Sequence, residues 1–187
     1  MNFNKHLGLE KTHAFLSGSK YSWVNYDEDK LDLTYRKFLA IQKGTELHEL
    51  AKNCIRLGVK LQKSKTSLNQ FVNDAIGFRM IPEQMLFYSY NAYGTCDAIS
   101  FRDNFLRIHD LKTGVIPVNM HQLEIYSALF CLEYNFLPKN IDIELRVYQN
   151  SNIFVHIPED IETIMNKIVL FDKRIEKIKM EESWLTE

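Results

Sequence analysis

Two aspartates and a lysine, Asp97, Asp110 and Lys112, occupy positions that a β-hairpin would bring together. Asp103 and Asn104 lie between two alternating segments, and both residue types tolerate the positive φ of a two-residue turn. Pairing outward from that turn sets Asp97 directly opposite Asp110. Period-two alternation places Lys112 on the same face as both acids. The spacing therefore predicts two carboxylates and one ammonium group at one end of a hairpin.

Directly opposed carboxylates, with Cβ atoms about 4.5–5.5 Å apart, repel each other by roughly 3 kcal/mol at an effective dielectric constant of 20. A bound cation, a shared proton or a neighbouring positive side chain must offset this repulsion. Lys112 supplies one positive charge, which leaves a residual negative site suited to a hard divalent cation. The alternative is a solvent-exposed end of the sheet, where screening makes the repulsion small. Spacing alone does not decide between them.

Four short motifs containing these residues follow one another along the chain. They are Gly44-Thr45-Glu46-Leu47-His48, Gly94-Thr95-Cys96-Asp97, Asp110-Leu111-Lys112-Thr113-Gly114 and Gln122-Leu123-Glu124-Ile125-Tyr126. In this order the chain resembles the PD-(D/E)XK nuclease superfamily, specifically its RecB-like and phage exonuclease branch. The resemblance implies a restriction-endonuclease-like mixed sheet flanked by helices, a DNA substrate, and phosphodiester hydrolysis that depends on a divalent metal.

The resemblance also implies roles for individual residues. The metal ligands would be His48, Asp97, Asp110 and the carbonyl of Leu111. The metal would be Mg²⁺ or Mn²⁺, and an imidazole ligand favours Mn²⁺ more than an all-oxygen site does. Glu83 matches an acidic position of this branch on the strand before the Gly-x-x-Asp motif, so it joins the expected catalytic group. Lys112 would be the motif lysine, which can orient the attacking water or stabilise developing charge.

Two features depart from the commonest form of the family. Asp110 stands where Glu is more frequent, a change that the superfamily tolerates. Relatives with an iron–sulphur cluster use four cysteines, whereas this chain has three, so no cluster is expected.

Other side chains are candidates for contact with the substrate. Gln122 and Tyr126 lie four residues apart on one helix face, where they could contact DNA or position the lysine and the scissile phosphate. Without the flanking motifs, Tyr126 would be assigned to the core and Gln122 to the surface. Lys52 and Arg56 lie away from the apolar stripe of their helix and could follow a phosphate backbone, although such basic stripes are more often solvated faces.

Hydrophobic periodicity predicts the elements that must position these residues. Helices are expected late in the first forty residues, from an N-cap at Thr45, and over residues 67–76, 120–134 and 161–178. Strands are expected at residues 83–90, 93–101, 105–111, 141–149 and 152–157. This order predicts an α/β fold, or α+β by a stricter label, with a mixed sheet, an antiparallel meander and flanking helices. One domain is expected over residues 1–187, helical to about residue 81 and catalytic from about 82.

Composition limits the partners and the compartment. The 187 residues carry a formal net charge of −1, which excludes a protein held on nucleic acid by bulk charge alone. Cys54, Cys96 and Cys131 form no CxxC pair, which favours a reducing compartment. No segment has the length of a membrane span or the pattern of a signal peptide. We therefore expect a cytoplasmic protein, in a bacterial host cell if the chain is phage-encoded.

The leading prediction is a metal-dependent deoxyribonuclease, of the phage or prophage exonuclease type, acting in recombination or repair. Its expected partner is DNA, with a homo-oligomer or a recombination protein as further options. One alternative is a structure-specific endonuclease or junction resolvase with the same chemistry. The other is a non-catalytic DNA-binding accessory module of recombination. Retention of Asp97, Asp110 and Lys112 argues against a degenerate site.

Overall fold

The computed structural model describes residues 13–114 and 117–183. The chain divides into two compact units between Lys43 and Gly44. The first unit contains the 3-10 helix η1 (Gly18–Asn25) and the beginning of helix α1 (Glu28–Leu57). Within it, the ring of Phe15 packs 5.0 Å from Tyr35 and 5.4 Å from Phe38, measured between centroids. These aromatic contacts hold the segment before α1 against the helix.

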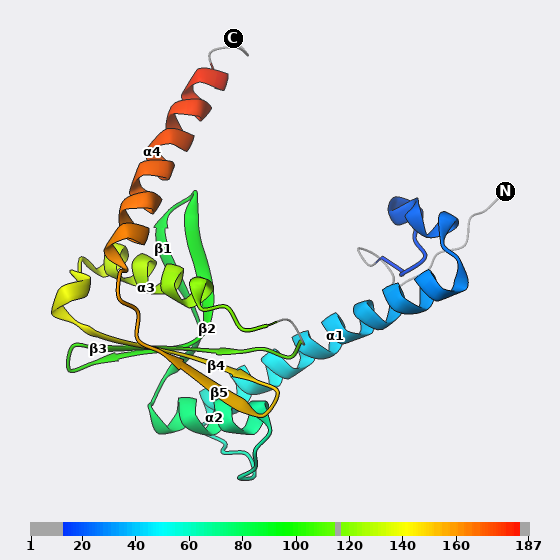
Figure 1. Cartoon of the computed structure of the whole chain (residues 1–187), viewed down its shortest axis with the longest axis horizontal. Coiled ribbons are helices and arrows are strands. Elements are labelled where there is room, and N and C mark those ends of the chain that lie inside the picture. Colours follow the sequence, from blue (N-terminus) through cyan, green and yellow to red (C-terminus); the bar gives the residue numbers. More distant parts are fainter. Residues whose placement is uncertain (1–12, 115–116, 184–187) are drawn as a thin grey trace, which may run out of the picture. The chain divides into compact units, whose positions relative to one another are not determined.

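The second unit is an α+β fold built on a five-stranded mixed sheet, as predicted (Figure 1). Its elements after α1 are α2 (Ser67–Gly77), β1 (Ile81–Ser89), β2 (Ala92–Arg102), β3 (Phe105–Leu111), α3 (His121–Tyr134), η2 (Pro138–Asn140), β4 (Asp142–Gln149), β5 (Asn152–His156) and α4 (Glu162–Ser183). The strand order is β1-β2-β3-β4-β5. Strands β3 and β4 pair in parallel and the other neighbours pair antiparallel. Helix α3 makes the crossover that a parallel pair requires.

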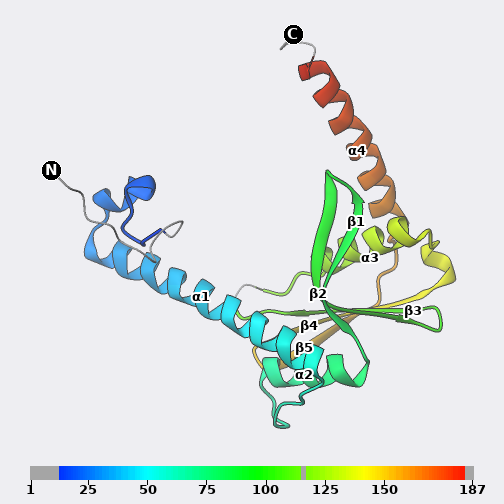
Figure 2. The ribbon, with the colours of Figure 1, turned by 180° about the vertical axis from the view of Figure 1, so that it is seen from behind.

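Helices cover both faces of this sheet (Figure 2). One buried cluster joins the sheet to α3 and α4 and includes Leu106, Leu123 and Ile161. The other joins it to α2 and the C-terminal part of α1 and includes Ala51 and Phe71. Strand β3 contributes to both clusters, because its alternate side chains point to opposite faces. The end of β3 is therefore fixed from both sides.

The β2–β3 hairpin has the predicted turn and register. Asp103 and Asn104 have φ of 51° and 58°, which is the pattern of a type I′ turn. The predicted pairing holds over five consecutive pairs, the last of which is Ala98–His109. The ladder stops there, one position before Asp97. Beyond that pair, the two strands are linked by a hydrogen bond from the backbone N–H of Leu111 to Oδ2 of Asp97.

One predicted helix start is wrong. Thr45 is not an N-cap, because α1 runs without interruption from Glu28 to Leu57. The first turn of α1 is instead capped by Asp27, whose Oδ1 accepts a hydrogen bond from the backbone N–H of Lys30 at 2.8 Å. A Gly-Thr pair inside a helix costs only about 1 kcal/mol relative to good helix formers, so the flanking apolar periodicity prevails. The remaining predicted helices and strands are present at the expected places.

The cysteines and the possibility of a membrane span were the remaining expectations. Cys54, Cys96 and Cys131 are buried free thiols. Among residues 13–114 and 117–183, no helix combines the length and the apolar character needed to cross a lipid bilayer.

Candidate metal and catalytic site

Three acidic residues lie at one level across three neighbouring strands. Glu83 on β1 lies between the two residues that pair with the neighbours of Asp97 on β2. Asp97 and Asp110 in turn lie one position beyond the last pair of the β2–β3 ladder. The β2–β3 backbone ladder therefore stops at the level of the three acidic residues. Registers of two hairpins, not one, produce this arrangement.

The sheet also bends at this level. Glu83 has φ of 52°, a left-handed conformation that costs a non-glycine residue on the order of 1–3 kcal/mol. On β2, Cys96 packs in the cluster under α3, whereas Ala98, two residues later, packs in the cluster under α2. The regular alternation is thus broken at Asp97. Such strained positions are concentrated at functional sites, because folding gives no reason to keep them.

His48, Glu83 and Asp97 form a group suited to a metal ion. Each offers one ligand atom, and these atoms all lie within 4.8 Å of one another. His48 reaches the group from α1, with Nδ1 3.3 Å from Oδ2 of Asp97. Hydrogen bonding to Asp97 raises the pKa of His48 above its ordinary value, against the opposing effect of burial. Two carboxylates and one imidazole are a donor set that binds divalent cations.

Asp110 is not part of that three-residue group, but the charge of Asp97 acts on its carboxylate. Its carboxylate is buried, and Nζ of Lys112 lies 3.1 Å from Oδ1 and 3.0 Å from Oδ2. Only Oδ1 receives a hydrogen bond, and Oδ2 accepts none from the described residues. Burial, followed by the charge of Asp97, raises the pKa of Asp110 to about 6. Both oxygens lie within ion-pair distance of Lys112, and a carboxylate in this position can also ligate a divalent cation.

A chain of side-chain hydrogen bonds holds Lys112 from α3. Its Nζ donates to Oε1 of Gln122 at 2.7 Å, and Nε2 of Gln122 donates to the hydroxyl of Tyr126 at 3.0 Å. The four residues Asp110, Lys112, Gln122 and Tyr126 are thus brought together, as the motifs predicted. The backbone N–H of Leu111 donates to Oδ2 of Asp97 at 2.8 Å. Ligation by the carbonyl of Leu111 stays a prediction.

Two motif glycines are explained by close packing around this site. A Cβ on Gly94 would lie 2.8 Å from Cε1 of Tyr126, and a Cβ on Gly44 would lie 2.8 Å from Oγ1 of Thr113. Real Cβ atoms essentially never approach other atoms so closely. Glycine therefore lets β2 pass against Tyr126 and lets α1 pass against the segment after β3. The sequence contains both glycines but gives no indication of what they contact.

A groove of about 510 Å³ lies beside these residues and is lined by His48, Lys112 and Gln122 among others. Lys52 and Arg56 are not among its lining residues. Nζ of Lys52 instead pairs with Oε2 of Glu49 at 2.9 Å on the surface of α1. Contact of Lys52 and Arg56 with a substrate stays a prediction.

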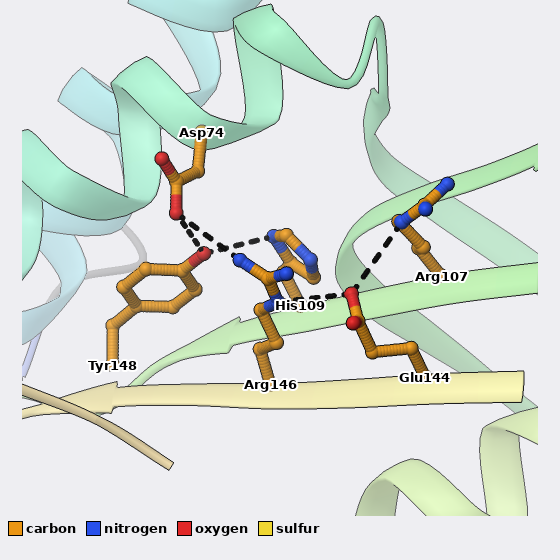
Figure 3. A network of polar contacts seen from close by, with 6 residues as sticks. All are labelled: Asp74, Arg107, His109, Glu144, Arg146 and Tyr148. Atoms are coloured by element: carbon orange, nitrogen blue, oxygen red, sulfur yellow. Dashed lines mark hydrogen bonds and ion pairs between the residues drawn. The ribbon is translucent and has the colours of Figure 1, made fainter. Parts of the chain in front are cut away.

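The opposite face of the sheet carries a polar network that sequence reasoning missed (Figure 3). The hydroxyl of Tyr148 donates to Oδ2 of Asp74 at 2.7 Å and contacts Nδ1 of His109 at 3.2 Å. Nε of Arg146 donates to Oε1 of Glu144 at 2.9 Å. Burial, with the two nearby arginines, lowers the pKa of His109 to about 3, so its ring is neutral. No motif links these residues, which come from α2, β3 and β4.

This network is connected to the strand end that carries Lys112. His109 and Asp110 are neighbours on β3, but His109 contacts Tyr148 whereas Asp110 pairs with Lys112. The backbone N–H of Lys112 donates to the carbonyl of Tyr148 at 2.9 Å. Tyr148 therefore links the network directly to the strand end that carries the lysine.

No protein-family model, no curated protein and no solved structure matches this chain. The membership of a nuclease superfamily stays a prediction from the four motifs.

Proposed function

We propose that this chain is a divalent-metal-dependent deoxyribonuclease. The observation that carries the proposal is the convergence of His48, Glu83 and Asp97, with ligand atoms within 4.8 Å, beside the ion pair of the buried Asp110 with Lys112. These residues come from α1, β1, β2 and β3, far apart in the sequence. Repulsion between Asp97 and Asp110 and the left-handed backbone of Glu83 both oppose folding, which favours a functional role for this group.

The residues present fit a divalent cation, with His48, Glu83, Asp97 and Asp110 as the side chains that would hold it. Bound there, Mg²⁺ or Mn²⁺ would polarise a phosphodiester and make water more acidic. Oδ2 of Asp110 supports this fit, because this buried oxygen receives no hydrogen bond from the described residues, although Nζ of Lys112 lies 3.0 Å away.

Lys112 supplies the remaining chemistry from this chain. Asp110 and Gln122 hold its Nζ by hydrogen bonds of 3.1 Å and 2.7 Å, so its position is set before substrate binds. An ammonium group so held can orient water toward phosphorus or stabilise charge on the non-bridging oxygens. Because the acceptors of Nζ are fixed by β3 and α3, little reorganisation accompanies the reaction.

The motif resemblance supports a phage-type exonuclease acting in recombination or repair as the form of this activity. Exonuclease and endonuclease action are separated by the substrate, because only an endonuclease cleaves closed circular DNA. The decisive assay incubates linear and circular DNA, single- and double-stranded, with Mg²⁺, Mn²⁺ or EDTA. We expect cleavage of linear DNA with either metal and none in EDTA.

Site variants test whether the cleavage comes from this protein or from a contaminating nuclease. Lys112→Ala and Asp97→Ala are expected to lower the cleavage rate by at least about 100-fold, as loss of a charged catalytic group does. Lys177→Ala is the matched control, since this lysine is exposed on α4 and its Nζ lies 3.8 Å from Oε1 of Glu181, also on the surface of α4. Cleavage that persists in EDTA, or that both site variants retain, would contradict the proposal. DNA binding without any cleavage would favour the accessory module.

A further inference from the structure

The hairpin of β1 and β2 presents aromatic rings to solvent beyond the acidic group. Tyr90 and Tyr93 are 87% and 57% exposed, and Phe87 is 39% exposed. The ring of Phe87 lies 6.3 Å from Tyr93 in a nearly parallel arrangement and 5.5 Å from Tyr90 edge to face. The three rings form one continuous surface, which we call the aromatic hairpin surface.

This hairpin carries no charge over a long stretch. Residues 84–96 contain no Asp, Glu, Lys, Arg or His, although charged residues make up 25% of the chain. An exposed strand pair normally carries charges that keep other molecules from adding to it. Here the exposed face instead offers flat, neutral, partly polar rings, which are suited to stacking with another π-system.

Contacts with α3 and α4 hold the backbone of the hairpin from its other side. Ser89 donates to Oδ1 of Asp172 on α4, and Asn91 at the tip bonds to Asp172 and Glu176. Gly94 packs against Tyr126 of α3. Helices α3 and α4 therefore cover the face opposite the rings (Figures 1 and 2). Each ring has only two rotatable side-chain bonds, so ordering it on a ligand costs little conformational entropy.

The same two strands connect the rings to the proposed metal group. Phe87 lies four residues after Glu83 on β1, and its partner Tyr93 lies four residues before Asp97 on β2. At about 3.3 Å per residue, the ring pair lies about 13 Å along the strands from the acids. Stacked nucleotides are spaced by about 3.4 Å, so that span corresponds to about four nucleotides of one strand.

We propose that the aromatic hairpin surface binds unpaired bases of the DNA strand being cleaved, about four nucleotides from the scissile phosphate. This inference rests on the proposed nuclease function and adds a substrate class, a strand with unpaired bases near the cut. Bases of any identity stack on aromatic rings, so the contact is independent of sequence. Continuity with the acidic group on the same strands favours DNA over a protein partner as the occupant.

The first test measures binding separately from cleavage. The dissociation constant of a single-stranded oligonucleotide of about 16 nucleotides is measured in EDTA by fluorescence anisotropy. Combined replacement of Phe87, Tyr90 and Tyr93 by Ala is expected to weaken binding by at least about tenfold. Tyr90→Phe with Tyr93→Phe keeps the rings and the affinity. The control is Phe154→Ala on β5. Phe154 is 39% exposed, as Phe87 is, and its replacement is expected to leave the affinity unchanged.

The second test locates the contact on the substrate. An abasic site is moved along the oligonucleotide, and wild type is expected to lose affinity when the missing base lies about four nucleotides from the cleaved bond. The triple Ala variant should be insensitive to the same lesion. Full affinity in that variant, with circular dichroism showing a folded protein, overturns the inference. A change of oligomeric state without a change in affinity would assign the surface to a second copy instead.

Failure of the two proposals can be told apart. Absence of cleavage by wild type in Mg²⁺ or Mn²⁺ removes the nuclease function, whereas the affinity measurements in EDTA do not depend on catalysis. Cleavage with undiminished affinity in the triple Ala variant removes only the stacking contact.

Discussion

Gly94→Ala tests whether the packing of β2 against α3 sets the catalytic geometry. The new Cβ would lie 2.8 Å from Cε1 of Tyr126, where ordinary contact begins at 3.4 Å. Overpacking of this kind costs about 1–3 kcal/mol. Replacing a strand glycine by alanine returns about 0.5–1 kcal/mol through the unfolded chain. The expected net loss in the free energy of unfolding is therefore on the order of 1–2 kcal/mol.

The displaced ring should also affect catalysis. The hydroxyl of Tyr126 accepts a hydrogen bond from Gln122, which in turn holds Nζ of Lys112. A shift of this chain by a fraction of an ångström moves the ammonium group, so we expect kcat to fall by up to about 100-fold. Stability is measured by urea denaturation in EDTA, and kcat by cleavage of linear DNA with Mn²⁺.

A double-mutant cycle makes this prediction specific. In a Tyr126→Ala background the ring is absent, so Gly94→Ala should cost no stability. Gly77→Ala is the control, because a Cβ at Gly77 meets no atom within 4 Å. If Gly94→Ala costs as much without the Tyr126 ring as with it, the close approach is not the cause. Wild-type stability in Gly94→Ala would refute the reasoning outright.

Two further predictions concern the buried polar groups. Because burial and the charge of Asp97 raise the pKa of Asp110 to about 6, Asp110→Asn should stabilise the metal-free protein at pH 7 by on the order of 2 kcal/mol. The destabilisation by the raised pKa is fully present above pH 6, and it disappears as the pH falls below the pKa of Asp110 in the unfolded chain. The urea midpoints of the two proteins should therefore converge near pH 4. A less stable Asn variant at pH 7 would contradict this prediction. Tyr148→Phe removes the donor to Asp74 and should cost about 1–3 kcal/mol in urea denaturation. Unchanged stability of that variant would show that the network of Figure 3 contributes nothing to the support of β3.

Much of the fold was accessible from periodicity and turn chemistry. The Asp103-Asn104 turn was enough to place the register of β2 and β3, because a two-residue loop admits few alternatives and each register sends a different set of side chains to the core. The same reasoning failed at Thr45, where a good capping residue lies within an apolar pattern that continues on both sides. A capping signal is worth about 1 kcal/mol, and the helix-forming residues on both sides of Gly44-Thr45 outweigh it.

The candidate site was only partly accessible. Motif order placed His48, Asp97, Asp110, Lys112 and Gln122 in one site, but their pairing was not encoded in spacing. That Asp97 joins His48 and Glu83, whereas Asp110 joins Lys112, depends on where the bend of β1 and β2 falls and on where α1 crosses the sheet. Such relations are set by three-dimensional packing between elements that are far apart in the chain.

The residue pattern was sufficient for the elements, one hairpin register and the residue types of the site, since each of these depends on near neighbours in the chain. Folding of the whole unit established the contacts that no local pattern contains. Examples are the close approach of Gly94 to Tyr126 and the network of Asp74, His109 and Tyr148 beneath the site. Both depend on which surfaces meet when helices pack on a twisted sheet, and that outcome is determined by the summed packing of the core.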